Sequence, residues 1–338
     1  MLHETSDCTG WSVCGREKRG ARRRGRRTPL VCWAMPPTTR TAHAPRTTIR
    51  IGAHVSSSGG AEHAADRAHA LGCDTLQIFS ASPRTWRATP PSPQTCSELR
   101  RRRAEFDLHP LVVHANYLIN LAGREGELLQ RSRQGLRGEI ERAVALGAEY
   151  LVLHPGSTMG EDRATALERW EEGVRVAFRG LERSELTLLV ENTAGGGDRL
   201  GGTFVEVAEL LDRLKGLPVA ACIDTCHCWV AGYDVRSASG FEATMTELDA
   251  TIGLARVPVL HANDAKAARG SHLDRHEHIG EGQLGRECFR LFLNDPRMAG
   301  KAFILETPVD EPGDAERNLK ALRGLVTPRP PARRAKRV

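Results

Sequence analysis

The sequence has no long apolar run. Its 338 residues contain no uninterrupted apolar stretch of about 18 residues, which is the length that a membrane-spanning helix needs. Arg26 and Arg27 faintly resemble a twin-arginine export signal, but no apolar segment of about 7–15 residues follows them. We therefore expect no membrane span and no export, and hence a cytoplasmic protein.

Two common kinds of site also lack their sequence signatures. The nine cysteines form no even, regular framework, and without an export signal they are expected to be reduced thiols. Cys222, Cys226 and Cys228 surround His227 and leave a thiolate zinc site open as an alternative, although their spacing matches no common Cys₂His₂ pattern. The glycine-rich segment 194–202 lacks the Lys-Ser/Thr of a phosphate-binding P-loop, so a flexible loop is predicted there.

Positive charge is concentrated at the two ends of the chain. The formal net charge is +6, but residues 1–50 contribute +8 and residues 327–338 contribute +5, which leaves −7 for residues 51–326. We expect residues 1–47 to be a disordered basic extension and 327–338 to be a basic tail. Met35 lies shortly before the first predicted strand, so a start of translation at that residue remains an open alternative. Basic ends bind nucleic acid or acidic surfaces without specificity, and they say nothing about the central domain.

Six apolar runs each end on a residue that can bind a metal ion. They are Pro110–His114, Tyr150–His154, Leu186–Glu191, Val219–Asp224, Pro258–His261 and Ala302–Glu306. Two further runs, Thr48–His54 and Asp74–Phe79, have a similar form, and the second carries no ligand. Short Leu-rich and β-branched runs of this kind predict strands that are buried on both faces.

Helix-length segments separate these eight predicted strands. The predicted helices are Gly59–Leu71, Ser97–Phe106 with Ser97 as its N-cap, Arg124–Leu146, Arg163–Leu181, Thr203–Leu214, Phe241–Leu254 and Gly285–Leu293. The alternation predicts one α/β domain, a (β/α)₈ barrel over residues 48–326, and no sequence repeat indicates a solenoid. The ligand-type residues would then meet at the mouth formed by the carboxyl ends of the strands, where barrel enzymes perform their chemistry.

Three further ligand-type residues lie close to the strand ends. His227 follows Asp224 just beyond one strand, and Asp274 and His276 occupy a loop between the last two strands. The nine candidate ligands are His114, His154, Glu191, Asp224, His227, His261, Asp274, His276 and Glu306. A carboxylate at the end of an apolar strand needs a cation, and imidazole mixed with carboxylate suits Zn²⁺, with Mn²⁺ or Fe²⁺ as other options. Because nine ligands are too many for one ion, the set predicts three, with carboxylates that bridge them.

Eight segments give the chain a resemblance to a known family. They are Ile51–Gly60, Tyr117–Leu121, His154–Ser157, Glu191–Phe204, Ile223–Asp234, His261–Lys266, Asp274–Gly282 and Leu305–Pro308. In this order, over about residues 48–326, they resemble the endonuclease IV family of apurinic/apyrimidinic endonucleases. The resemblance implies a TIM barrel with three zinc ions. It groups His114, His154 and Glu191 on one ion, Glu191, Asp224, His261 and Glu306 on a second, and His227, Asp274 and His276 on the third.

The resemblance also implies what the barrel acts on. The expected partner is double-stranded DNA with abasic or 3′-blocked lesions, which a monomer would hydrolyse 5′ to the abasic site to leave a 3′-hydroxyl. Glu191 would be the catalytic residue, because as a bridging ligand it positions the nucleophile. Arg84, Tyr117 and Leu118 fall at positions that insert into DNA beside the lesion, although ordinary loop packing is the simpler interpretation of Tyr117 and Leu118 alone.

A metal-dependent sugar isomerase or epimerase on the same kind of barrel is the alternative function. Such a barrel also carries Glu, Asp and His at its strand ends, but it needs only one or two ions. His227, Asp274 and His276 would then be surplus. A non-catalytic DNA-binding protein that uses its basic ends is a third interpretation, and the full ligand set argues against it.

Overall fold

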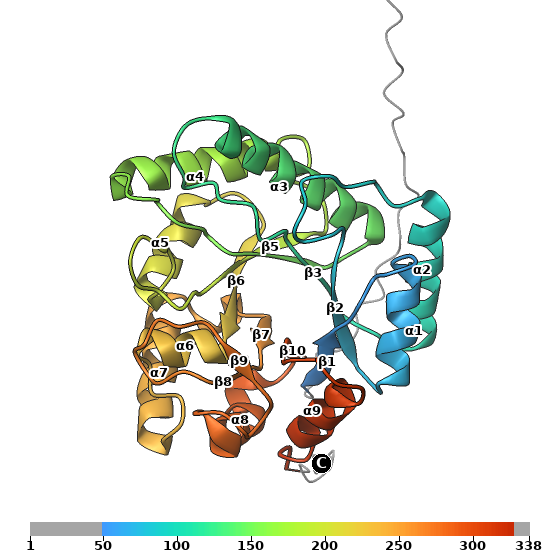
Figure 1. Cartoon of the computed structure of the whole chain (residues 1–338), viewed down its shortest axis with the longest axis vertical. Coiled ribbons are helices and arrows are strands. Elements are labelled where there is room, and N and C mark those ends of the chain that lie inside the picture. The colour runs from blue at the N-terminus through green and yellow to red at the C-terminus, as the bar shows by residue number, and fades with distance from the viewer. Residues whose placement is uncertain (1–48, 328–338) are drawn as a thin grey trace, which may run out of the picture. The chain divides into compact units, whose positions relative to one another are not determined.

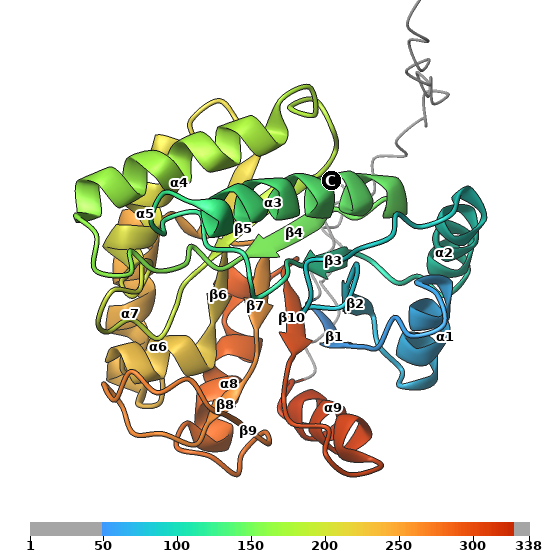
Figure 2. The same ribbon diagram turned by 45° about the horizontal axis from the view of Figure 1, so that its top comes forward.

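Eight parallel strands close into a barrel that is ringed by helices (Figures 1 and 2), which confirms the predicted (β/α)₈ TIM barrel. The structure is a computed structural model that describes residues 49–327, so the predictions for residues 1–47 and almost all of 327–338 lie outside the described part. The barrel strands are β1 (Arg50–His54), β2 (Thr75–Phe79), β3 (Leu111–His114), β4 (Tyr150–Leu153), β5 (Thr187–Glu191), β6 (Val219–Asp224), β7 (Val259–His261) and β10 (Ala302–Leu305). Strand β1 pairs with both β2 and β10, and these two pairings close the barrel.

The helices cover the outside of the barrel. They are α1 (Glu62–Ala70), α2 (Pro93–Glu105), α3 (Glu127–Leu146), α4 (Arg163–Phe178), α5 (Phe204–Arg213), α6 (Thr225–Ala231), α7 (Ala238–Thr251), α8 (Gly285–Asn294) and α9 (Asp314–Arg323), with 3₁₀ turns at Leu254–Arg256 and Pro296–Met298. Their apolar faces pack on the outward side chains of the strands and form the larger of two buried clusters. Among the helices of residues 49–327, none combines the length and the apolarity needed to cross a membrane.

A smaller buried cluster fills the barrel itself. It contains the inward side chains of six strands, namely Val112, Val152, Leu189, Ala220, Cys222, Val259, Ala302 and Ile304. Strands β1 and β2 complete the interior with Gly52, Thr75 and Gln77. Gly52 is required there, because a Cβ atom at this position would lie 1.9 Å from the carbonyl oxygen of Thr75.

The structure differs from the prediction at the start of one helix, in two further helices and in one hairpin. The predicted start of a helix at Ser97 is wrong: α2 begins at Pro93, and the Ser92 side chain caps it by accepting a hydrogen bond from the Thr95 amide. Helices α6 and α9 were not anticipated. Neither was a short antiparallel hairpin, β8 (Asp264–Ala265) with β9 (His276–Glu277), which lies beside α6 and α8 in Figures 1 and 2.

Candidate metal centre

The alternation of side chains along each strand directs the candidate ligands into the mouth of the barrel. In a strand, residues two apart point to the same face of the sheet. Glu191 follows the interior residue Leu189 by two positions, and His261 follows the interior residue Val259 in the same way. The other four strand-end ligands also come two residues after an interior side chain: His114, His154, Asp224 and Glu306. His154 and Glu306 lie one residue beyond the strands β4 and β10, and they keep this alternation.

The first group of ligands surrounds one oxygen of Glu191. Glu191 is completely buried, and its Oε2 lies 3.0 Å from His154 Nε2 and 3.4 Å from His114 Nε2. Ligand atoms of these three residues all lie within 4.8 Å of one another, as a single ion would require. The structure therefore brings together His114, His154 and Glu191, from three neighbouring strands.

The second group shares Glu191 with the first. His261 Nδ1 lies 2.9 Å from Glu191 Oε1 and 3.2 Å from Glu306 Oε2, and Asp224 completes the group. Asp224 and His261 are register partners in β6 and β7, which explains their proximity. Because Glu191 directs one oxygen to each group, it has the geometry of a bridging ligand.

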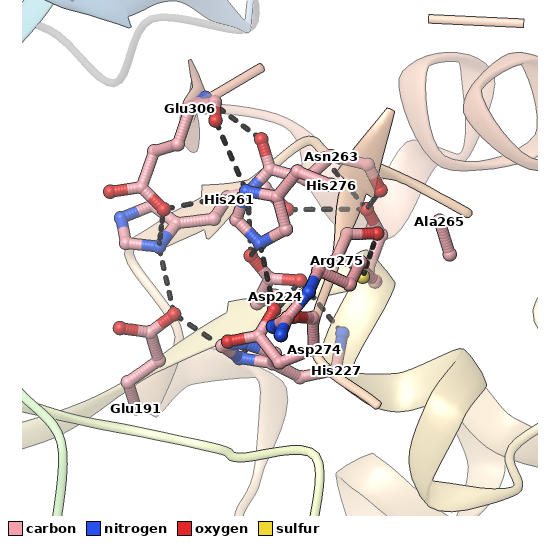
Figure 3. Close-up of polar contacts among 12 residues, drawn as sticks. Glu191, Asp224, His227, His261, Asn263, Ala265, Asp274, Arg275, His276 and Glu306 are labelled. Carbon is pink, nitrogen blue, oxygen red and sulfur yellow. Dashed lines mark hydrogen bonds and ion pairs between the residues drawn. The ribbon is translucent and has the colours of Figure 1, made fainter. Parts of the chain in front are cut away.

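The third group depends on elements that the sequence did not predict. Asp224 caps helix α6 by accepting a hydrogen bond from the His227 amide at 2.8 Å, so the helix start fixes His227. Asp274 then bridges two imidazoles, with Oδ2 at 3.2 Å from His227 Nε2 and Oδ1 at 3.3 Å from His276 Nε2. Figure 3 shows Glu306, His261 and Glu191 along one side and His276, Asp274 and His227 beside them.

The hairpin that carries His276 is anchored by a buried acid. Asp264 accepts hydrogen bonds from the backbone amides of Ala265, Gly280, Gly282 and Leu284 at 2.8–3.2 Å. Burial raises the pKa of Asp264, and these amide hydrogen bonds oppose that effect. The carboxylate thus holds the loop after β9 and serves the third group indirectly.

The electrostatics of the centre are those of a dense network of acids and imidazoles. Burial alone would raise the pKa of Glu191, but the imidazoles of His261 and His154 hold it well below its usual range. The same balance lowers the pKa of Glu306 and Asp274. Although burial disfavours the imidazolium form, the carboxylates raise the pKa of His227 and His261 well above the usual value, and that of His276 to about 9.

The donor set fits divalent cations better than protons. Within residues 49–327, no lysine or arginine lies within ion-pair distance of Glu191, Asp224, Asp274 or Glu306. Two buried atoms of the network, Glu191 Oε2 and His276 Nε2, have no hydrogen-bond partner among the described residues. An unpaired buried polar atom is costly. Carboxylate oxygens and imidazole nitrogens converge at these points without hydrogen-bond geometry. An ion bound at such a point would satisfy them.

Outer hydrogen bonds orient three of the imidazoles in one way. The Nδ1 atoms of His114, His227 and His276 face the backbone carbonyls of Ala115, Asn192 and Glu306 at 2.8–3.1 Å, which leaves each Nε2 directed to the carboxylates. Such partners select the tautomer of a metal-binding histidine.

Side-chain amides that the sequence did not single out hold two of the acidic residues, Asp224 and Glu306, in place. Asn263 Nδ2 donates to Asp224 Oδ2 at 2.6 Å, and Asn192 Oδ1 accepts from the Asp224 amide at 2.7 Å. Asn263 also accepts a hydrogen bond from the Glu306 amide through its Oδ1 at 2.8 Å. These asparagines follow His261 and Glu191 in the sequence within two residues, and that closeness was the available signal.

Of the three cysteines of the alternative thiolate zinc site, only Cys226 lies in a group that could hold a metal ion. Cys226 lies near Asp274 and His276, whereas Cys222 points into the barrel and Cys228 receives a hydrogen bond from Asn192 at 3.5 Å. Burial raises the pKa of the Cys226, Cys222 and Cys228 thiols, which opposes thiolate formation. The three thiols therefore do not form one site.

The residues predicted to insert into DNA, Arg84, Tyr117 and Leu118, lie at the rim of the mouth, and we call them the wedge residues. Tyr117 and Leu118 are 57% and 38% exposed, and the Tyr117 ring lies 5.4 Å from the ring of His114 and 6.3 Å from that of His154. Arg84 is exposed in the loop after β2. Asn116 joins the two loops, because its Nδ2 donates to the Thr85 carbonyl at 2.7 Å and its Oδ1 accepts from the Leu118 amide at 2.8 Å.

A cavity of about 280 Å³ connects this rim to the centre. Residues that line it include Tyr117, Asn120, His154, Arg199, His227 and Asp274. Members of the first and third groups are therefore accessible from the same cavity as the predicted wedge.

Comparisons with known proteins identify the family. The family described as "Xylose isomerase-like TIM barrel" matches residues 65–325. A protein of Solibacter usitatus named "Probable endonuclease 4" is 49% identical over 281 residues, which cover 82% of this chain and 97% of that protein. The chain belongs to the endonuclease IV family.

Solved structures agree with this membership. The crystal structure of endonuclease IV from Thermus thermophilus has a TM-score of 0.74 and 41% identity, over 82% of this chain and 98% of that one. A D-tagatose 3-epimerase-like protein has a TM-score of 0.59 at 19% identity, over 82% of this chain and 97% of that one, and this likeness shows the fold alone. Endonuclease IV family members and sugar epimerases thus share the barrel, and the site must distinguish them.

Proposed function

We propose that the chain is a DNA-repair endonuclease of the deoxyribonuclease IV type. It would hydrolyse the phosphodiester 5′ to an abasic site in duplex DNA and leave a 3′-hydroxyl, using three zinc ions held by the three ligand groups. The observation that carries the proposal is the third group, in which Asp274 lies 3.2 Å from His227 and 3.3 Å from His276, at the same mouth as the two strand-end groups. Ligand atoms of His227 and His276 also lie within 4.8 Å of one another and of Asp224. The name of the relative that is 49% identical supports it.

The charge of the mouth explains why ions are needed for this substrate. Four carboxylates face the mouth that would have to accept a phosphodiester. Without bound cations, their negative charges would repel the negative phosphate at this range. Three bound dications would reverse that charge and supply Lewis-acid stabilisation to the phosphate. The oxygen of water would join phosphorus while the bond to the 3′-oxygen breaks, and the 3′-oxygen would leave with a proton.

The residues of the chain then have distinct tasks. Glu191 holds two groups at a fixed separation through its two oxygens, and we assign it the positioning of the attacking water. Asp274 lies at the cavity and joins His227 to His276. Tyr117 and Leu118 would occupy the stack that an abasic nucleotide leaves, and a nucleotide without a base costs less to flip out than an intact one.

The exposed apolar side chains also point to a partner at this face. Seven of the eight large apolar residues exposed in the described chain lie in loops at the mouth or in the first turn of a following helix: Tyr117, Leu118, Leu128, Met159, Val205, Leu273 and Val309. Apolar side chains that gather at one end of a molecule mark an interaction surface. A duplex seated on the mouth would cover them.

An incision assay tests the proposed reaction. A duplex with one abasic analogue should be cut 5′ to the analogue, and prior treatment with a chelator should abolish the cut. Added Zn²⁺ should restore it. A chelator-resistant cut, or no cut at all, would rule out the proposed reaction.

Metal analysis separates the sugar isomerase or epimerase alternative. The nuclease should retain about three ions per chain, whereas about one ion with turnover of a ketose or aldose would favour the isomerase. The 19% identity to the epimerase-like structure gives that alternative no support beyond the fold.

Zinc affinity should rise with pH, because the imidazole ligands must lose a proton before they bind the ion. Because the pKa of His276 is raised to about 9, its ring is the doubly protonated imidazolium at pH 7 in the ion-free protein. A histidine binds a metal ion only as the neutral imidazole, so zinc has to displace the second proton. Affinity for the third site should therefore rise about tenfold per pH unit for each proton displaced up to about pH 9. Calorimetry in two buffers of different ionisation heat measures the release, and no proton release at pH 7 would contradict the prediction.

Replacement of the wedge tyrosine should reduce lesion discrimination. Tyr117→Ala is expected to weaken binding to abasic duplex by about 1–3 kcal/mol, or roughly five- to 150-fold, because it removes one stacking partner. Binding to intact duplex should change little. Val176→Ala, which trims an exposed side chain on the outer helix α4, is the control. Equal losses for the two duplexes in a fluorescence anisotropy titration would refute the wedge.

A further inference from the structure

One candidate ligand has its ring turned the other way. His261 directs Nδ1 to the carboxylates, at 2.9 Å from Glu191 and 3.2 Å from Glu306, whereas His114, His227 and His276 direct Nε2 to theirs. The outer nitrogen of His261 also has a different kind of partner. Its Nε2 lies 2.9 Å from the side-chain oxygen of Gln77, and the other three rings use backbone carbonyls.

Gln77 lies completely buried in strand β2, the one barrel strand on which the sequence showed no ligand at or beyond its end. Its side chain makes three contacts. Oε1 faces His261 Nε2, and Nε2 lies 2.5 Å from Glu306 Oε1 and 3.1 Å from His54 Nδ1. The carboxamide therefore touches two members of the second ligand group and the strand-end histidine that has no place in any group.

The orientation of the carboxamide follows from its partners. The carboxylate of Glu306 only accepts hydrogen bonds, so the NH₂ group of Gln77 must face it. The oxygen of Gln77 then faces His261 Nε2, and an oxygen acceptor requires that this ring nitrogen carry a proton. A ring with its proton on Nε2 offers the lone pair of Nδ1 to the carboxylate side, where an ion of the second group would lie.

His54 completes the same chain of hydrogen bonds. Its Nδ1 faces the NH₂ group of Gln77 and so acts as an acceptor, which places the ring proton on Nε2. His54 is thereby kept as a neutral support for Gln77, although it ends a strand as His114 does.

We propose that Gln77 is a positioning residue of the second ion site: it fixes His261 as an Nδ1 ligand and holds Glu306 beside it. The inference rests on the proposed function only in that the second group binds an ion. Outer-sphere partners of this kind typically contribute about 10- to 100-fold to metal affinity. In the part of the chain that the structure describes, the partner of His261 Nε2 is a side chain and not a backbone carbonyl, so Gln77 is the residue through which this ring can be tested.

Two substitutions separate the halves of the proposal. Gln77→Met keeps the length of the side chain and removes all three hydrogen bonds, to His261, Glu306 and His54. Gln77→Glu keeps an acceptor for His261 Nε2 but replaces the donor to Glu306 with a second carboxylate. Thr75→Val is the matched control, because Thr75 is another buried, hydrogen-bonded interior residue of β2. It is the first residue of the strand, two positions before Gln77, and its Oγ1 donates to the Pro110 carbonyl at 2.6 Å.

The experiment measures zinc retention and the His261 ring directly. Zinc-loaded protein is competed with a chelator, and the imidazole N–H protons are observed by ¹⁵N-edited NMR. We expect Gln77→Met to lower the affinity for one ion about 10- to 100-fold and to expose the His261 Nε2–H proton to rapid exchange with water. Gln77→Glu should protect that proton and still lower the affinity. Thr75→Val should leave both measurements as in the wild type.

Several results would overturn the proposal. Wild-type zinc affinity in Gln77→Met would do so, and so would an equal loss in Thr75→Val, because the effect would then belong to strand packing. If Gln77→Met does not fold, Gln77→Glu decides alone: unchanged zinc affinity in that variant refutes the role in holding Glu306. Both measurements are made without DNA, so failure of the nuclease proposal would leave them intact, and wild-type incision would survive failure of the Gln77 proposal.

Discussion

Glu191→Gln is expected to lower incision of abasic duplex by about three orders of magnitude or more. Glu191 Oε2 faces His154 and His114, and its Oε1 faces His261. Glutamine keeps the size of the side chain but presents only one oxygen, and its NH₂ group would face nitrogen ligands on the other side. Two ligand groups would lose their shared anion, and a loss of several kcal/mol in stabilisation of charge corresponds to this factor.

Single-turnover incision and zinc content should be measured on the same preparation of this variant. Glu149→Gln is the matched control, because Glu149 pairs with Arg103 at 2.7 Å immediately before β4, at the opposite end of the barrel from the mouth. It should lose stability and keep incision. If Glu191→Gln cut at a rate within tenfold of the wild type, Glu191 would not be the bridging residue.

The meeting of the strand-end candidate ligands at one mouth could be predicted because two periodicities coincide in this chain. Apolar runs of strand length end on His, Asp or Glu, and the alternation of side chains sends those ends inward. Glu191 after Leu189 and His261 after Val259 illustrate the pattern. Barrel closure then brings together residues that are far apart in sequence, without any further information about loops.

The same alternation marks Gln77 and His54, whose function could not be predicted from it. Both are interior positions of their strands, like Thr75 and Gly52. A neutral amide in a strand carries no ligand signature, and its partner His261 lies 184 residues away along the chain. Hydrogen-bond direction depends on atomic geometry, so the sequence could place Gln77 in the barrel but could not show what it touches.

Local capping explains two of the remaining differences, the start of α2 and the presence of α6. Ser92 and Pro93 are a helix start signal that the charged run after Ser97 concealed. Asp224 acts both as a strand-end ligand candidate and as the N-cap of α6, and the sequence pattern displayed only the first of these roles. That second role sets the position of His227, so the third group depends on a helix that was not predicted.

Asp274→Asn should separate a nuclease with three ions from a barrel with one or two. Asp274 is the carboxylate that joins His227 to His276, at 3.2 and 3.3 Å. An amide in its place offers one oxygen and directs NH₂ at the other imidazole. We expect the loss of about one zinc ion per chain and a fall in kcat of about 100-fold or more, because even residues that only support a metal ligand contribute about 10- to 100-fold. An isomerase would not need this residue, and its metal content would stay constant.

The loss of one negative charge in Asp274→Asn would by itself strengthen DNA binding, whereas the loss of an ion should slow the reaction. Removing a negative charge from the mouth favours binding of a polyanion, so a slower reaction in Asp274→Asn cannot arise from general electrostatics. Asp198→Asn is the control, because Asp198 is an exposed acid in the glycine-rich loop after β5. It removes the same charge outside the three ligand groups, and it should keep all its zinc and bind DNA slightly more tightly. If both variants retain the wild-type zinc content and rate, His227, Asp274 and His276 do not hold an ion, and the distinction from the sugar isomerases disappears with it.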